Sequence, residues 1–254
     1  MWKQLKKMSI ALIFISSAFI LTGCAEDKAH TKRQSLAKQD LGKTFLAQGD
    51  YTAGLNELLK AAELDPENPD IQYNLALGYR FMDLHNKAIT HFKKAIALKP
   101  NYSEAYNDLG CTYLLLSKWE LAITYFKKSL ENTLYPTPHF AQNNMGYAYY
   151  QKGEYKRAIE SYRDAIKYQP SFSRAFHNLG ITYEAINEWD KAIRAYKESI
   201  RYAPKDPRSH FFLGKLYLKR KKPSLAIKKF EESIRLDKNN IYTTEAKHLL
   251  ETIK

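Results

Sequence analysis

Cysteine is almost absent from this sequence, because only Cys24 and Cys111 occur among its 254 residues. A fold built on a framework of several disulfides is therefore excluded, and the chain must be stabilised by the packing of apolar side chains. Long apolar runs are absent as well. The run from Ile10 to Leu21 is interrupted by Ser16 and Ser17, and it is too short to cross a bilayer, which needs roughly 20 residues.

Enzyme signatures are also missing. The sequence contains no HExxH or GxSxG motif, and its ten glycines form no loop that could cradle a phosphate. Its seven histidines include no pair at the i,i+4 spacing of helical metal ligands, since even His85 and His91 are six residues apart. We therefore expect no enzymatic activity, no metal, no cofactor and no small-molecule substrate.

The sequence does contain a long internal repeat. A small residue followed by Ile or Leu recurs six times, at intervals of 34, 34, 36, 34 and 34 residues. These small residues are Gly54, Ala88, Ala122, Ala158, Ala192 and Ala226. One structural unit is therefore repeated six times, and it gains two residues once, within Ser129–Phe140.

Each unit has the pattern of two amphipathic helices. Between Asn68 and Pro100, apolar residues follow spacings of three and four, and the alternation typical of strands is absent. Helix starts are indicated by a capping residue before a proline, at Asn68-Pro69, Thr137-Pro138 and Asp206-Pro207. Helix ends are indicated by prolines that cannot continue a helix, which are Pro66, Pro100, Pro170 and Pro204.

Over about 200 residues these units resemble tetratricopeptide repeats. Leu-Gly pairs recur at Leu41-Gly42, Leu109-Gly110, Leu179-Gly180 and Leu213-Gly214, and the aromatics three positions later are Phe45, Tyr79, Tyr113, Tyr149, Tyr183 and Tyr217. The resemblance implies an all-α, right-handed superhelical solenoid of six helical pairs, with a concave surface lined by first helices and a C-terminal capping helix. We place the repeats at 35–68, 69–102, 103–136, 139–172, 173–206 and 207–240, and the cap at 241–254.

The N-terminal residues have the features of an export signal. Three lysines precede the apolar run, which ends in Leu21-Thr22-Gly23-Cys24. These four residues resemble the bacterial lipobox, in which cleavage leaves the cysteine first and its thiol carries diacylglycerol. The resemblance implies a signal peptide at 1–23, a lipidated Cys24 and a polar tether at 24–34. Because Ala25 follows, it also implies the inner leaflet of the outer membrane, facing the periplasm.

The two extra residues of the repeat fall beside Thr133-Leu134-Tyr135-Pro136, between the third and fourth units. We interpret this place as a seam between two triplets of repeats, and a tolerated two-residue insertion is the alternative. A lipobox, tetratricopeptide units and this tetrapeptide together resemble the pilotins, the outer-membrane lipoproteins of type IV pilus biogenesis. The resemblance implies a scaffold that assists the assembly or outer-membrane localisation of a secretin, the pore through which the pilus leaves the cell.

The expected concave surface indicates where a protein partner would bind. Residues at the fifth, ninth, twelfth and thirteenth positions of each unit line this surface in tetratricopeptide folds, and many are apolar or aromatic here. The candidate residues are Tyr73, Leu77, Arg80, Phe81, Asn107, Leu114, Asn143, Tyr147, Tyr150, Ile181 and Phe211. The alternative is that curvature or the terminal helix buries much of this row as core, as a small side chain such as Cys111 would suit.

Acidic residues are outnumbered, 27 against 40 Lys and Arg, which gives a net charge of +13. The positive charge gathers in Lys215–Lys229, where anionic lipid or an acidic protein face would fit and a solvated basic face is the alternative. Export and the lack of a groove-reading motif argue against nucleic acid as a partner. The competing function is a periplasmic adaptor that docks cell-wall hydrolases or other envelope proteins.

Overall fold

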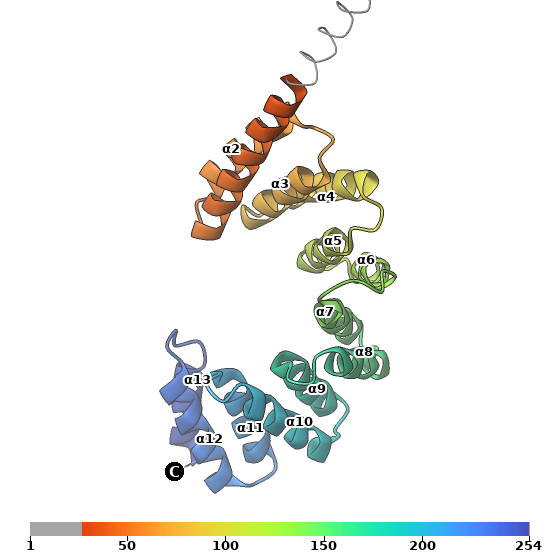
Figure 1. Ribbon diagram of the computed structural model, residues 1–254. Helices are drawn as coiled ribbons and strands as arrows, with labels where there is room; N and C mark the ends of the chain where they lie inside the picture. The colour runs from red at the N-terminus through yellow and green to blue at the C-terminus, as the bar shows by residue number, and fades with distance from the viewer. Residues whose placement is uncertain (1–26, 254) are drawn as a thin grey trace, which may run out of the picture. The chain divides into compact units, whose positions relative to one another are not determined.

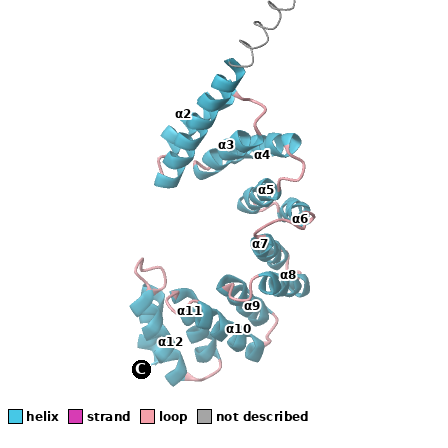
Figure 2. Ribbon diagram, in the orientation of Figure 1, coloured by secondary structure: helices cyan, strands magenta, loops and turns pink. Residues whose placement is uncertain are grey.

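The computed structural model describes residues 27–253, and every regular element among them is an α-helix (Figures 1 and 2). The all-α fold predicted from the repeats is confirmed, because the helices follow one another as pairs and end in one additional helix. The signal peptide and Cys24 lie outside the described residues, and their assignment stays a prediction. Residues 27–34, for which we expected a polar tether, are helical and continue directly into the opening repeat.

Each repeat consists of a first and a second helix joined by a tight turn. In the opening repeat the first helix covers residues 27–48. The other first helices are α3 (Pro69–Phe81), α5 (Ser103–Leu115), α7 (Pro138–Gln151), α9 (Ser173–Ala185) and α11 (Pro207–Lys219). The second helices are α2 (Tyr51–Leu64), α4 (His85–Leu98), α6 (Trp119–Leu130), α8 (Tyr155–Tyr168), α10 (Trp189–Tyr202) and α12 (Pro223–Leu236). The terminal helix α13 (Thr243–Ile253) packs against α12.

The helix starts follow the sequence signals at two of the three predicted caps. Asn68 accepts hydrogen bonds from the backbone of Asp70 and Ile71, and Asp206 accepts one from the backbone of Arg208. These bonds satisfy amides that have no partner inside the helix. Thr137 is the exception, because it makes no side-chain cap bond although Pro138 does open α7. The capping role predicted for Thr137 is therefore wrong.

The turn between first and second helices has the same geometry in all six repeats. Its middle residue has a positive φ in each case: Gly49, Asp83, Ser117, Gly153, Asn187 and Lys221. The next residue donates its amide to the carbonyl of the aromatic residue near the end of the first helix, as Glu188 does to Tyr183 and Lys222 to Tyr217. Glycine and asparagine adopt this left-handed conformation at low cost, whereas a lysine is strained by roughly 1 kcal/mol.

In the third to sixth repeats, a glycine of the first helix allows an aromatic ring of the second helix to lie against it. A Cβ added to Gly110, Gly146, Gly180 or Gly214 would come within 2.4 to 2.7 Å of a ring carbon. The rings belong, in the same order, to Phe126, Tyr162, Tyr196 and Phe230, which are at most 1% exposed. Close approach, and not backbone conformation, therefore explains these glycines.

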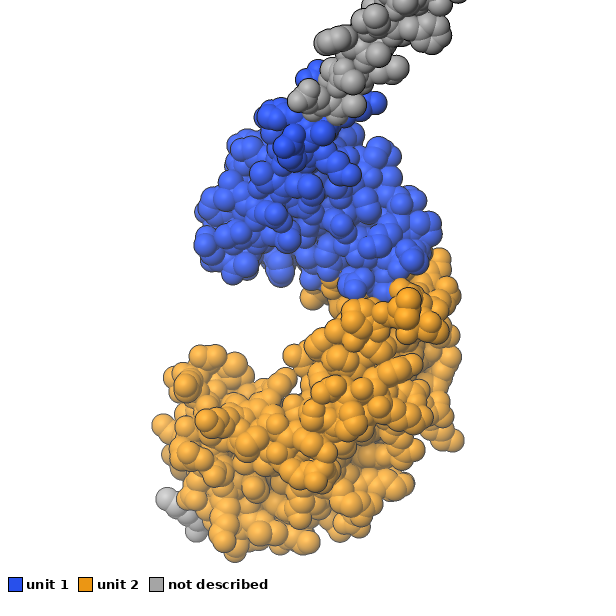
Figure 3. All heavy atoms as spheres, viewed as in Figure 1, with its two compact units in different colours: residues 1–105 blue, residues 106–254 orange. Residues whose placement is uncertain are grey.

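The chain forms two compact units, 1–105 and 106–254, of which residues 27–253 are described (Figure 3). The core of the first unit includes Leu46, Leu55, Leu58, Ala61, Ile71 and Leu75. In the second unit the largest fully buried side chains are Tyr162, Tyr196, Phe126, Phe230, Leu109, Leu213, Leu216 and Thr112. Each unit therefore has apolar packing of its own.

The two-residue insertion does not separate compact units, contrary to the seam that we predicted there. Helices α6 and α7, which flank it, pack against each other, and the division of the chain falls at Ala105 instead. Within the inserted loop, Tyr135 is only 6% exposed whereas Leu134 is 87% exposed. The loop therefore anchors itself through the tyrosine and leaves the leucine in solvent.

Candidate protein-binding surface

In the first unit, the four predicted site residues all lie on α3, and Phe81 is the most exposed of them, at 45%. Its ring stacks on Tyr51 with 5.1 Å between centroids, and the guanidinium of Arg80 lies 5.7 Å from its centre. Tyr73 is half-buried, because its ring packs 5.9 Å from Phe92 and 5.1 Å from Tyr102. Phe81 is thus available to a partner, whereas Tyr73 contributes to the packing.

In the second unit, exposed apolar side chains occur at the end of α5 and on α7. Tyr147 is 41% exposed and Leu115 is 61% exposed. The ring of Trp119 meets Tyr147 edge-on at 6.5 Å, so Tyr147 is held in place on one side. Leu114 and Ile181 are half-buried. A rigid aromatic ring with one open face loses little conformational entropy when it binds, which suits it to protein recognition.

Tyr150 lies one turn beyond Tyr147 on α7 and packs against Tyr155, with ring centroids 5.6 Å apart. Burial, with smaller effects of Tyr155 and Glu184, raises the pKa of Tyr150. The half-buried carboxyl of Glu184 accepts a 2.6 Å hydrogen bond from the hydroxyl of Tyr196, and its pKa is raised by burial. Phenol and carboxyl groups therefore interrupt an otherwise apolar face.

Two of the predicted site residues are buried, and we correct the prediction for them. Phe211 is 2% exposed because its ring packs 5.1 Å from Tyr242, in the segment before α13, and 6.0 Å from Phe230. Asn143 is 3% exposed and accepts a 2.9 Å hydrogen bond from Asn178. The terminal segment therefore covers part of the row as core, which is the alternative that the sequence left open. Asn107 is half-buried.

A buried polar network links α9, α10 and α11. His177, 7% exposed, shares a 2.9 Å hydrogen bond with the hydroxyl of Ser209, which is 2.8 Å from that of Ser199. Burial lowers the pKa of His177 to about 4, so the ring is neutral at physiological pH. Because all three side chains are buried and bonded to one another, the network stabilises the interface between repeats.

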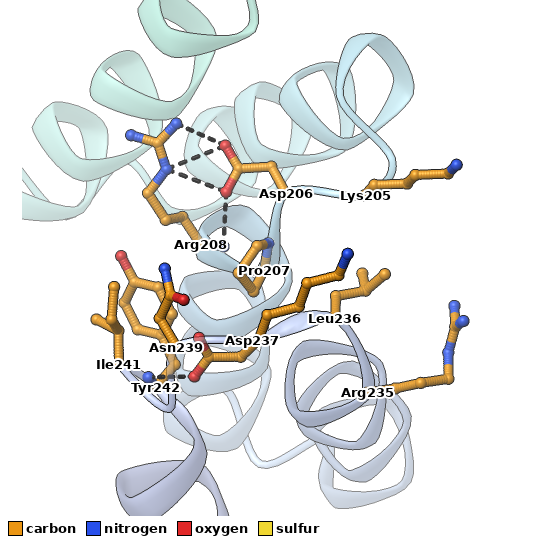
Figure 4. Close-up of a pocket in the computed structure, with 11 residues that line it drawn as sticks. Lys205, Asp206, Pro207, Arg208, Arg235, Leu236, Asp237, Asn239, Ile241 and Tyr242 are labelled. Atoms are coloured by element: carbon orange, nitrogen blue, oxygen red, sulfur yellow. Dashed lines mark hydrogen bonds and ion pairs between the residues drawn. The ribbon is translucent and has the colours of Figure 1, made fainter. Parts of the chain in front are cut away.

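An open cavity of about 640 Å³ lies between the loop before α11 and the loop before α13 (Figure 4). Burial would raise the pKa of Asp206, but the hydrogen bonds from Arg208 hold it below its usual value. Asp237 accepts bonds from the amides of Tyr242 and Thr243 at 2.6 and 2.9 Å. Both carboxylates are therefore used in holding the loops together, and the cavity offers no pair of groups suited to catalysis.

The described residues contain no group of three or more His, Cys, Asp and Glu side chains that could hold a metal ion. Cys111 is half-buried, and its sulfur lies 3.3 Å from the side-chain amide of Asn144. None of the helices within residues 27–253 is both long enough and apolar enough to cross a membrane.

Structural comparison finds similar folds in several proteins of known structure. The crystal structure of PilW, a widely conserved type IV pilus biogenesis factor, is 23% identical and has a TM-score of 0.76, with 85% of this chain and 98% of that chain covered. Pseudomonas aeruginosa pilF is 18% identical with a TM-score of 0.73, covering 88% and 99%. MamA is 27% identical with a TM-score of 0.58, covering 65% and 95%. At these identities the likeness establishes the fold.

Family profiles agree with the fold. Three profiles match: one described as TPR repeat at 42–79 and 146–187, and two described as tetratricopeptide repeat at 69–133 and 177–241. No curated protein sequence matches the chain. Proteins of this repeat class bind other proteins and typically have no enzymatic activity. The repeat spacing, the helical pairs and the matched profiles together show that this chain is a tetratricopeptide repeat protein.

Proposed function

We propose that the protein is a lipid-anchored scaffold that binds a type IV pilus secretin and assists its assembly or its localisation to the outer membrane. The observation that carries the proposal is the likeness to PilW, which extends over almost the whole of that chain. The lipobox ending at Cys24 and the tetrapeptide Thr133–Pro136 support it independently. A lipid at Cys24 would hold the repeats at the membrane in which the secretin assembles.

The exposed apolar side chains of the repeats are the groups best suited to bind the secretin. Phe81 in the first unit and Tyr147 in the second have rings that are fixed on one side by Tyr51 and Trp119. Burying such a ring against a partner typically contributes about 2 kcal/mol or more when it is a hot spot. Tyr147, together with Leu115, therefore forms the preferred contact in the second unit.

The loop of the tetrapeptide supplies a third contact. Asn132 accepts hydrogen bonds from Leu134 through its side chain, at 3.0 Å, and from Tyr135 through its backbone carbonyl, at 3.1 Å. These bonds, with the buried ring of Tyr135, fix the loop, and the side chain of the preceding residue, Leu134, is 87% exposed. A leucine held in solvent by an ordered loop suits insertion into a partner's apolar pocket.

Deletion of the gene and complementation test the proposal. Without the protein we expect unassembled or misplaced secretin and no pilus-dependent twitching, and wild-type protein should restore both. Tyr147→Ala should restore secretin multimers poorly, whereas Tyr168→Ala, which removes a 56% exposed ring from a second helix, should restore them fully. Normal secretin multimers in the deletion strain would exclude this function, and recovery of cell-wall hydrolases with the purified protein would favour the adaptor.

A further inference from the structure

The turn between α11 and α12 contains four consecutive basic residues, Lys219, Arg220, Lys221 and Lys222, which we call the basic turn. We propose that the basic turn binds the anionic phosphate headgroups of a lipid bilayer. This contact goes beyond the proposed function, because it would form on the second unit, needs no secretin and does not require lipidation of Cys24.

The other repeats provide an internal reference for the backbone of this turn. At the residue with positive φ they have Gly49, Asp83, Ser117, Gly153 or Asn187, side chains that are absent or short and polar. Only Lys221 places a long charged side chain there, at φ 55°. Its amide donates to Leu218 at 2.9 Å, as that of Asn187 does to Glu184 at 3.0 Å, so the turn itself is the same. The lysine therefore adds strain without improving the local structure.

The net charge of the turn distinguishes it from the other five turns more clearly than its backbone does. Arg220, Lys221 and Lys222 give +3, whereas residues 48–50, 82–84, 116–118, 152–154 and 186–188 give −1, −1, +1, 0 and −1. Among the described residues, no carboxylate lies within salt-bridge distance of the basic turn, although neighbouring cations such as Lys191 and Lys215 do have acidic partners. Four adjacent cations repel one another, and only Lys219 has attractive interactions with the described residues, a cation–π contact with Trp189 and a coulombic interaction with Glu184.

The surroundings of the basic turn favour a bilayer over an acidic protein segment. All four basic side chains are exposed, and Leu225, at the start of α12, is 43% exposed beside them. The ammonium of Lys219 lies 4.2 Å from the ring of Trp189. Cations combined with an exposed leucine and an indole suit the interface, where phosphates and the acyl boundary lie within a few ångströms. The long side chains of Arg220, Lys221 and Lys222, which have no ion-pair partner among the described residues, suit a fluid layer of charge better than one defined peptide.

A probe at the turn itself can test this in the full chain. Residues 1–26 contain the apolar run Ile10–Leu21, which would associate with any vesicle, so the signal must come from the turn. An environment-sensitive fluorophore on Ser224→Cys, in a background of Cys24→Ser and Cys111→Ala, provides that signal. We expect its emission to increase with vesicles of phosphatidylcholine containing about 30% phosphatidylglycerol, not with phosphatidylcholine alone, and to fall again in about 0.5 M NaCl.

The fifth repeat supplies the matched variant. Arg220→Ile, Lys221→Asn and Lys222→Glu together copy its turn, residues 186–188, and lower the net charge by four. Because the two turns share their hydrogen bonds, the fold should be retained, and circular dichroism would verify this. The apparent affinity for anionic vesicles should fall about tenfold or more. The control combines Lys156→Glu and Lys197→Glu, exposed on α8 and α10, which also lowers the charge by four and should retain binding.

Three outcomes would overturn the inference. Equal responses of the triple variant and of the protein with the unmodified turn would show that these cations do not bind lipid. An equal loss of binding in the triple variant and in the Lys156→Glu, Lys197→Glu control would assign the effect to net charge and not to the turn. A response to a soluble polyglutamate peptide without any response to anionic vesicles would identify an acidic protein as the occupant. Because the assay contains no secretin, each result is independent of the pilus proposal.

Discussion

Replacing Gly180 by alanine tests the close packing inside a repeat, because two known effects oppose each other there. The new Cβ would lie 2.4, 2.6 and 2.8 Å from Cε1, Cδ1 and Cζ of Tyr196. Ordinary contact begins at about 3.4 Å, so the ring or the helix must move by roughly 1 Å. Tyr196 is fully buried and its hydroxyl is bonded to Glu184 at 2.6 Å, which leaves the ring little room.

The magnitude follows from the two effects. Alanine favours a helix interior over glycine by about 1 kcal/mol, whereas forcing extra volume into a packed core costs about 1 to 3 kcal/mol and occasionally more. With a ring that cannot rotate away, we expect the overlap to prevail and the net loss of stability to be about 2 kcal/mol. For a chain of this size that corresponds to a decrease in Tm of about 4 to 8 °C.

Thermal unfolding, with hydrogen exchange of α9 and α10, measures this loss. Tyr196→Leu provides the second half of the test, because a shorter side chain leaves room for the Cβ. In that background Gly180→Ala should stabilise by about 1 kcal/mol, as helix propensity alone predicts. A higher Tm for Gly180→Ala in the wild-type background would refute the reasoning. The second repeat has alanine, Ala76, at the equivalent place, so alanine itself is compatible with the repeat.

Three further predictions concern single side chains. Lys221→Asn should stabilise the chain by about 1 kcal/mol by relieving the left-handed strain, and Gly153→Lys should destabilise it comparably, both seen as Tm shifts. Asn68→Ala should cost about 1 kcal/mol in denaturant unfolding because a cap is lost, whereas Thr137→Ala should cost only a few tenths. His177 has a pKa of about 4 in the folded protein and 6.5 when free. The protein should therefore lose about 3 kcal/mol of stability as the pH falls from 6.5 towards 4, because the unfolded chain binds a proton that the folded chain does not. His177→Asn should remove this dependence in thermal melts recorded over a range of pH.

The repeat could be predicted from the sequence because its signals are local and occur six times. Leu-Gly pairs, aromatic positions and prolines each depend on contacts within one helical pair, so that each unit repeats the same physical constraint. The sequence places glycines in the Leu-Gly pairs at 110, 180 and 214, and the structure adds the ring that each one contacts. The interval of 34 residues, which occurs four times among the five, defined the pairs more firmly than any single motif could.

The candidate site was predicted less well, because exposure depends on what covers a residue from elsewhere in the chain. Phe211 occupies the same repeat position as Tyr73, yet Tyr242 packs on it from a segment that follows the last repeat. Asn143 is buried, and its side-chain oxygen accepts a hydrogen bond from Asn178, one repeat later. Thr137 has the residue type of a cap but a backbone with ψ of 50°, from which its hydroxyl does not reach the helix.

Aromatic residues have two separate roles in this chain, and rings packed beneath a glycine differ from rings that are open to solvent on one side. On second helices, rings such as Phe126 and Tyr162 lie beneath a glycine and are at most 1% exposed, so they determine the spacing of the pair. On first helices, Phe81 and Tyr147 are more than 40% exposed and are supported from one side only. Loss of a ring from the first group should therefore lower stability, and loss of a ring from the second group should weaken binding while the fold persists. Binding of a partner can consequently be altered by changing exposed first-helix rings such as Phe81 and Tyr147 without changing the packing that holds each pair together.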